Sequence, residues 1–209
     1  MKKINKQFST AFIMLVAIVL LGIPQLLQAQ NTFRFFAGKD ANIKVLGSSN
    51  VHDWTMESSV MESQGDFKFD ADNQLHSLTA LSFSVDAKSL KSEHESMDNR
   101  TYKTMKADKF PKVTYRLSSA VISMVQKNKY LIKTTGELTI AGATQTIAMD
   151  ITATVGQDKT IICTGSEKLK LTDYKIDPPS FMLGAMKVKN DLTIQFTLQY
   201  KNAQLLTKN

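Results

Sequence analysis

Apolar and polar side chains alternate through the last strand-like stretch of the chain, and this period of two constrains the fold more than any other feature. Its apolar residues are Val188, Leu192, Ile194, Phe196, Leu198 and Tyr200, interrupted only by Asn190. The residues between them are Lys187, Lys189, Asp191, Thr193, Gln195, Thr197 and Gln199. Because successive side chains of a strand point to opposite faces, the pattern predicts a strand with one buried and one solvated face.

Similar strand-like segments recur along the chain, separated by glycine or asparagine residues. They cover roughly residues 33–46, 50–61, 64–70, 81–86, 112–125, 129–140, 146–155 and 159–173. About nine short antiparallel strands in one domain predict an all-β fold, either a sandwich or a closed barrel. A closed barrel would leave no exposed strand edge for pairing with other chains.

Two segments depart from this alternation. Ser92 and Glu95 fit a capping box, and Met97 and Met105 follow on one helical face, so we expect one helical segment over about 92–107. The second segment, 177–186, contains two prolines followed by apolar residues. A loop of that composition must either plug the core or lie at the mouth of a cavity.

The N-terminus has the order of a secretory signal peptide: a basic segment, an apolar run over 11–21, and a small residue, Ala29, at the expected cleavage position. The run is shorter than the roughly 20 residues of a membrane-spanning helix. We therefore expect a cleaved signal peptide over 1–29 and one domain over 30–209. An N-terminal anchor that is retained is the alternative.

Charge and motif content argue against several functions. The formal net charge is +7, but the lysines are spread along the chain, so nucleic acid binding gains no support. Cys163 is the single cysteine and lies in an apolar stretch, which favours a buried structural thiol. No spacing of His, Cys and Asp is typical of a zinc site, and no nucleophile elbow or phosphate loop is present, so we predict neither a metal nor an enzyme.

Four segments together resemble the YceI-like family of exported lipocalin-like proteins. They are 47–54 (Gly-Ser-Ser-Asn-Val-His-Asp-Trp), Met97-Asp98 running on to 107–111, 136–142, and Pro178-Pro179 leading to Leu183-Gly184. The resemblance implies an antiparallel, lipocalin-like β-barrel of about eight strands with an internal tunnel. It also implies a periplasmic or secreted protein that holds a polyisoprenoid lipid, such as a quinone-like or prenyl-phosphate-like chain, as a non-catalytic carrier or reservoir.

Inward apolar residues are the candidates for the wall of such a tunnel, together with polar residues that could hold a lipid head. The predicted ligand-binding residues are His52, Trp54, Phe83, Met97, Arg100, Tyr102, Phe110, Met149, Phe181, Met182, Met186 and Phe196. Eight of the ten methionines follow the predicted signal peptide, and flexible thioethers suit a wall that adapts to an alkyl chain. Ordinary core packing would explain the apolar residues equally well.

The polar candidates also have two interpretations each. His52 shares a strand face with Trp54, so it could bind a polar head or be a core histidine bonded to a backbone carbonyl. Arg100 and Tyr102 lie beside Asp98 on the predicted helix, where they could meet a phosphate or quinone head. The alternative places Asp98 and Arg100 on a solvated face.

Two other functions remain open from the sequence. His52 could serve an enzyme that acts on a small hydrophobic substrate in the same cavity. An outer-membrane barrel would need Lys187 and Lys189 to face the lumen, which argues against that class. A hydrophobic lipid is therefore the expected partner, without stable membrane insertion of the mature domain, and a homodimer is compatible with the sequence.

Overall fold

The computed structural model describes residues 32–38, 40–181 and 183–203. The predicted signal peptide lies outside these residues. The strands are β1 (Thr32–Phe35), β2 (Asn42–Ser49), β3 (Asp53–Ser58), β4 (Met61–Phe69), β5 (Leu75–Asp86), β6 (Lys112–Gln126), β7 (Lys129–Ile140), β8 (Ala143–Val155), β9 (Ile161–Lys170), β10 (Ser180–Phe181) and β11 (Met186–Asn202).

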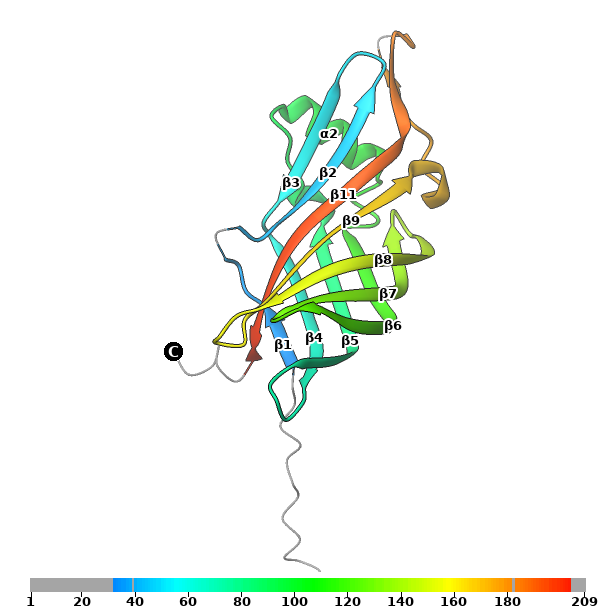
Figure 1. Cartoon of the computed structure of the whole chain (residues 1–209). Coiled ribbons are helices and arrows are strands. Elements are labelled where there is room, and N and C mark those ends of the chain that lie inside the picture. The colour runs from blue at the N-terminus through cyan, green and yellow to red at the C-terminus, as the bar shows by residue number, and fades with distance from the viewer. Residues whose placement is uncertain (1–31, 39, 182, 204–209) are drawn as a thin grey trace, which may run out of the picture. The chain divides into compact units, whose positions relative to one another are not determined.

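Eight of these strands form a closed antiparallel ring, in the order β1, β4, β5, β6, β7, β8, β9, β11 and back to β1 (Figure 1). Strand β11 closes it, since Phe35 pairs with Tyr200 on one edge and β9 runs along the other. The predicted all-β barrel of about eight strands is therefore confirmed, and the sandwich alternative is wrong. Strand β2 pairs with the first part of β11, and β3 pairs with β2, so these two strands extend the wall beyond the ring.

The segment 33–46, predicted as one strand, is divided in two because the chain leaves the ladder over 36–41. Gly38 donates a backbone hydrogen bond to Phe36, and Ala41 donates one to Gly38. A Cβ at residue 38 would meet the amide end of the Gln199 side chain, which packs against the detour at this point. The detour separates β1, at the lower end of the barrel in Figure 1, from β2 near the upper end.

The lower end of the barrel is filled by side chains. The rings of Phe33, Phe67 and Tyr200 pack together with centroid distances of 5.6 Å (Phe33–Phe67) and 5.3 Å (Phe67–Tyr200), and each ring is at most 2% exposed. The Tyr200 hydroxyl lies 2.8 Å from the Ser63 hydroxyl, which satisfies its polar atom. Cys163 is 4% exposed among these apolar residues, and burial raises the pKa of its thiol to about 12, as expected for a structural cysteine.

Aromatic rings at the wall of the barrel lie against glycines of a neighbouring strand. Trp54 of β3 occupies the space where a Cβ of Gly47 on β2 would be, and Phe196 of β11 occupies the same space at Gly165 on β9. Any larger residue at these two glycines would push the ring away from the wall. The glycines therefore let large aromatic groups line the barrel without projecting as far into its interior.

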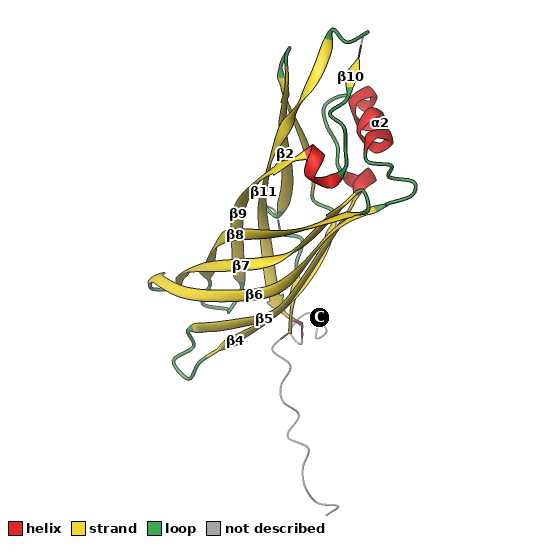
Figure 2. Cartoon of the chain, turned by 90° about the vertical axis from the view of Figure 1, so that its right-hand side faces the viewer, coloured by secondary structure: helices red, strands yellow, loops and turns green. Residues whose placement is uncertain are grey.

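Helix α2 (Glu95–Thr104), the short helical turns η1 (Ala87–Ser89) and η2 (Leu171–Tyr174), and β10 gather at the upper end of the barrel (Figure 2). The predicted helical segment is confirmed, although the α-helix is shorter than 92–107. No described helix is long and apolar enough to cross a membrane. The connections that carry these elements are the longest in the chain, and they surround the open end.

The predicted capping box is wrong. His94 is the N-cap, without a side-chain cap. The Ser92 hydroxyl instead donates to a carboxylate oxygen of Asp98 (2.8 Å) and lies 3.0 Å from the His94 carbonyl. The Ser92 backbone N–H also donates to Asp98, at 2.7 Å. Asp98, one turn into the helix, therefore fixes the start of α2 in place of Glu95.

Candidate functional site

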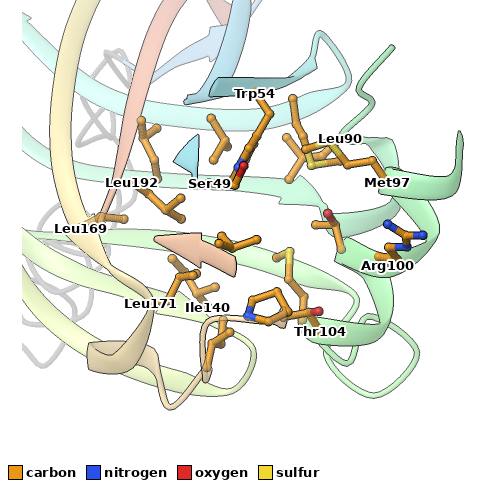
Figure 3. A pocket seen from close by; sticks show the side chains of 18 of the residues that line it. Ser49, Trp54, Leu90, Met97, Arg100, Thr104, Ile140, Leu169, Leu171 and Leu192 are labelled. Carbon is orange, nitrogen blue, oxygen red and sulfur yellow. The ribbon is translucent and has the colours of Figure 1, made fainter. Parts of the chain in front are cut away.

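A cavity of about 250 Å³ opens at the upper end of the barrel; we call it the upper chamber. Its strand wall includes Leu169 of β9 and Leu192 of β11, which lie across the chamber from Met97 of α2 (Figure 3). Along β11, the lining residues Val188, Leu192 and Ile194 alternate with mostly exposed ones, as a strand with one inward face requires. Further apolar lining residues are Ile43, Val45, Met56, Val85, Leu90, Met105, Val113, Ile140, Leu171, Ile176, Pro179, Phe181, Met186, Val188 and Ile194.

Helix α2 contributes one face to this chamber. Met97, Thr101 and Met105, four residues apart, all line it, together with Arg100 and Thr104. On the other side of the helix, the Tyr102 hydroxyl donates to the carbonyls of residues 88 and 90, at 3.0 and 2.7 Å. These bonds hold α2 against the segment that follows β5, so the helix forms a fixed part of the wall.

A second cavity, of about 80 Å³, lies deeper in the barrel; we call it the lower chamber. Phe83, Met149 and Phe196 line it. Among its described lining residues, only Glu167 carries a carboxyl group. Glu167 points inward from β9, and burial raises its pKa above the ordinary value. The carboxyl is therefore harder to ionise here than in water.

The structure places nine of the twelve predicted ligand-binding residues in the two chambers. The upper chamber is lined by His52, Trp54, Met97, Arg100, Phe181 and Met186, and the lower chamber by Phe83, Met149 and Phe196. Tyr102 and Phe110 line neither chamber, because the Tyr102 hydroxyl is bonded to backbone carbonyls and the Phe110 ring covers Gly142. Met182 lies outside the described residues.

His52 is at the mouth and not in the core. It precedes β3, its side chain is exposed, and its carbonyl accepts hydrogen bonds from the backbone N–H and hydroxyl of Ser49, at 2.9 and 3.0 Å. The alternative of a buried core histidine is therefore wrong. The imidazole makes no hydrogen bond or ion pair with another described residue, so no described group orients it as an acid or base.

The charge at the mouth is positive. Among the described residues that line the upper chamber, the full charges are those of Arg100 and Lys170, and neither Asp nor Glu is present. The Arg100 guanidinium lies 4.7 Å from the centroid of the Phe181 ring, a cation–π contact between α2 and the last connection. Its side chain remains exposed, so it can still meet an acceptor.

Asp98 does not offset this charge within the chamber. It is 3% exposed and does not line either chamber, which makes the predicted solvated position wrong. Burial alone would raise its pKa, but the hydrogen bonds from Ser92 and the charge of Lys91, 3.5 Å away, outweigh it and hold the pKa below the usual value. Asp98 therefore stays ionised as a structural group.

Two buried donors in the wall of the upper chamber have no hydrogen-bond partner among the described residues: Trp54 Nε1 and the Tyr174 hydroxyl. Tyr174 is 2% exposed, and burial, reinforced by the charges of Asp173 and Glu167, raises its pKa to about 12. It therefore keeps its proton near neutral pH.

Residues 30–200 match the YceI-like domain. The chain belongs to the YceI-like family. No protein with a curated description matches it. Among solved structures, it resembles BcnA of Burkholderia cenocepacia with a TM-score of 0.60 and 17% identity, over 76% of this chain and 95% of that one.

A second structural relative of this YceI-like chain is a polyisoprenoid binding domain from Saccharophagus degradans implicated in plant cell wall breakdown. The TM-score is 0.59 at 11% identity, over 84% of this chain and 96% of that domain. The YceI protein of Campylobacter jejuni is 22% identical, over 66% of this chain and 79% of its own, with a TM-score of 0.49. At these identities, the first two similarities show the fold.

Several residues of this YceI-like site carried no signal in the sequence. Leu90, Thr104 and Tyr174 line the upper chamber from connections and helix ends, where no alternation marks an inward face. The unpartnered state of Tyr174 depends on how η2 folds over the barrel. Glu167 could have been found, because it shares the inward parity of β9 with Cys163 and Leu169.

Proposed function

We propose that this YceI-like protein is an exported, non-catalytic carrier that holds the apolar chain of a polyisoprenoid or another long-chain lipid in the upper chamber. The observation that carries the proposal is the chamber itself, which is lined mostly by apolar side chains from strands and helix and lies above the packed aromatic rings of the lower end of the barrel. Each buried methylene contributes about 0.8 kcal/mol, so a few prenyl units need no strong polar contact.

Features of the mouth support a polar head at that end. The exposed guanidinium of Arg100 could bind oxygen atoms of a carbonyl, carboxylate or phosphate head. The absence of a carboxylate among the described lining residues favours a neutral or anionic head over a cationic one. The Saccharophagus degradans relative, described as a polyisoprenoid binding domain, is consistent with a prenyl chain.

Further observations support an exported carrier over an outer-membrane barrel or an enzyme. Lys187 and Lys189 are exposed, whereas Leu192 and Ile194 face the chambers, which is the opposite of an outer-membrane barrel with an apolar outer band. The signal-peptide pattern of residues 1–29 supports export to the periplasm or beyond. The unoriented His52 favours a carrier over an enzyme, because general acid–base catalysis needs a positioned group.

The test is retention of lipid by the purified protein, measured by native mass spectrometry and organic extraction. The wild type is expected to carry a lipid from its bacterial host. Leu192→Trp, which fills the upper chamber, should abolish retention, whereas Gln195→Trp, on the exposed face of the same strand, should not. An empty wild type that takes up no added lipid, or equal retention by both variants, would contradict the proposal.

A further inference from the structure

The two chambers meet at three side chains. Ile43 of β2, Val113 of β6 and Ile194 of β11 line both the upper and the lower chamber. They come from separate strands of the barrel wall, and we call the place where they border both chambers the waist. Any chain that enters at the mouth must pass the waist to reach the lower chamber.

Ile194 is the residue of the waist that faces the free space. Ile43 and Val113 are only 6% and 7% exposed, because neighbouring side chains cover them. Ile194 is half-buried, although it lies in the middle of a 17-residue strand whose cross-strand partners are Val45 and Glu167. Its remaining accessible surface therefore faces the chambers, both of which it lines.

The described side chains at the base of the lower chamber are tightly packed. Phe67, Tyr200 and Ile132 line it and are at most 1% exposed. An engineered apolar cavity of about 150 Å³ binds benzene, so 80 Å³ can take a few methylene-sized groups. The lower chamber is thus a small apolar space that a tail could fill if the waist were open.

We propose that Ile194 sets the longest apolar tail that this barrel accepts, by stopping the tail of a single-chain lipid at the waist. The proposal rests on the lipid-carrier function above and adds to it a specificity-determining residue. Each methylene buried in the upper chamber should tighten binding about fourfold. Once the tail reaches Ile194, further methylenes remain outside the chamber and the gain per methylene should fall to nearly nothing.

The test is a chain-length series, with straight-chain fatty acids and the corresponding alcohols lengthened by two carbons at a time. Dissociation constants are measured by displacement of a fluorescent fatty acid. In the wild type, affinity is expected to rise with the length of the tail and then level off, at the same tail length for the fatty acids and for the alcohols. In Ile194→Ala, the levelling-off should move to tails at least one step longer, and in Ile194→Phe it should move to shorter tails.

Leu138→Ala provides the matched control, because Leu138 lines only the lower chamber. With Ile194 in place, the enlarged lower chamber should leave the series unchanged, whereas Ile194→Ala combined with Leu138→Ala should accept still longer tails. Thermal melting identifies folded variants, and Ile194→Phe tests the proposal if Ile194→Ala does not fold. The proposal is wrong if the affinity of folded Ile194 variants levels off at the same tail length as that of the wild type. It is also wrong if Leu138→Ala alone changes that tail length. A wild type that binds no tail of any length overturns the carrier function and this proposal together.

Discussion

Replacing Asp98 with alanine should destabilise the protein through the start of α2. The Asp98 carboxylate accepts two hydrogen bonds from Ser92, at 2.7 and 2.8 Å, and is 3% exposed. Hydrogen bonds to a charged group contribute roughly 1.5–3 kcal/mol, and the loss would leave the Ser92 donors in a partly buried site. The pair with Lys91 adds little, because the Lys91 side chain is 61% exposed and solvent screens it.

We therefore expect Asp98→Ala to lower the free energy of unfolding by roughly 2–4 kcal/mol, measured by urea denaturation followed by circular dichroism. The matched control is Asp108→Ala. Asp108 lies 2.6 Å from Lys88, a shorter ion pair than Asp98–Lys91, but its side chain is 92% exposed, so its loss should change stability little. Equal losses in the two variants would refute the argument that burial and the Ser92 bonds give Asp98 its effect.

The difference between the wild type and Asp98→Ala should also depend on pH in a defined direction. The folded-state pKa of Asp98 lies below its ordinary value of 3.8, so the unfolded chain binds the proton more readily. The stability that the carboxylate contributes is thus complete above the unfolded pKa and is lost as the pH falls through the folded pKa. A difference that stays constant well below pH 3.8 would contradict this assignment.

Three further predictions concern the chambers. Arg100→Ala should weaken binding of a fatty acid about tenfold but leave the matching alcohol nearly unchanged, measured by fluorescence displacement; equal effects on both would exclude a role with anionic heads. Glu167→Gln should raise the free energy of unfolding at neutral pH but not below pH 4.5. Because the folded-state pKa of Glu167 lies above 4.5, the wild type loses stability as the pH rises from 4.5 to that folded-state pKa, and the glutamine variant does not. Denaturation at both pH values tests it, and a gain of equal size at both would contradict it. Cys163 should not react with a thiol reagent until the protein unfolds, since its thiol is buried and its pKa is about 12; rapid labelling of the native protein would be inconsistent with that burial.

The alternation of side chains predicted most of the barrel. Ile194, Phe196 and Leu198 face the interior as their period of two required, and Lys187 and Lys189 are exposed. What the alternation could not predict was where a strand leaves the ladder. Over 36–41 the chain turns through backbone hydrogen bonds from Gly38 to Phe36 and from Ala41 to Gly38, and no change in the side-chain pattern marks that turn.

The site was predicted less completely, because its members come from connections as well as strands. Tyr102 and Phe110 had suitable chemistry, but their contacts with the chain after β5 and with Gly142 keep them out of the chambers. Ser92 and Glu95 had the spacing of a capping box, but Asp98 competed successfully for the Ser92 donors. Such competition among nearby acceptors is settled by tertiary packing, which spacing does not encode.

The central claim is that an apolar chain lies in the upper chamber, between α2 and β11. The most direct measurement is a crystal structure of the protein with a fatty acid brominated at the end of its tail. The account predicts an anomalous bromine peak inside the barrel at the level of Ile194, with the carboxylate at the mouth near Arg100. A bromine peak on the outer surface, or a reversed chain with its carboxylate at the waist, would contradict it.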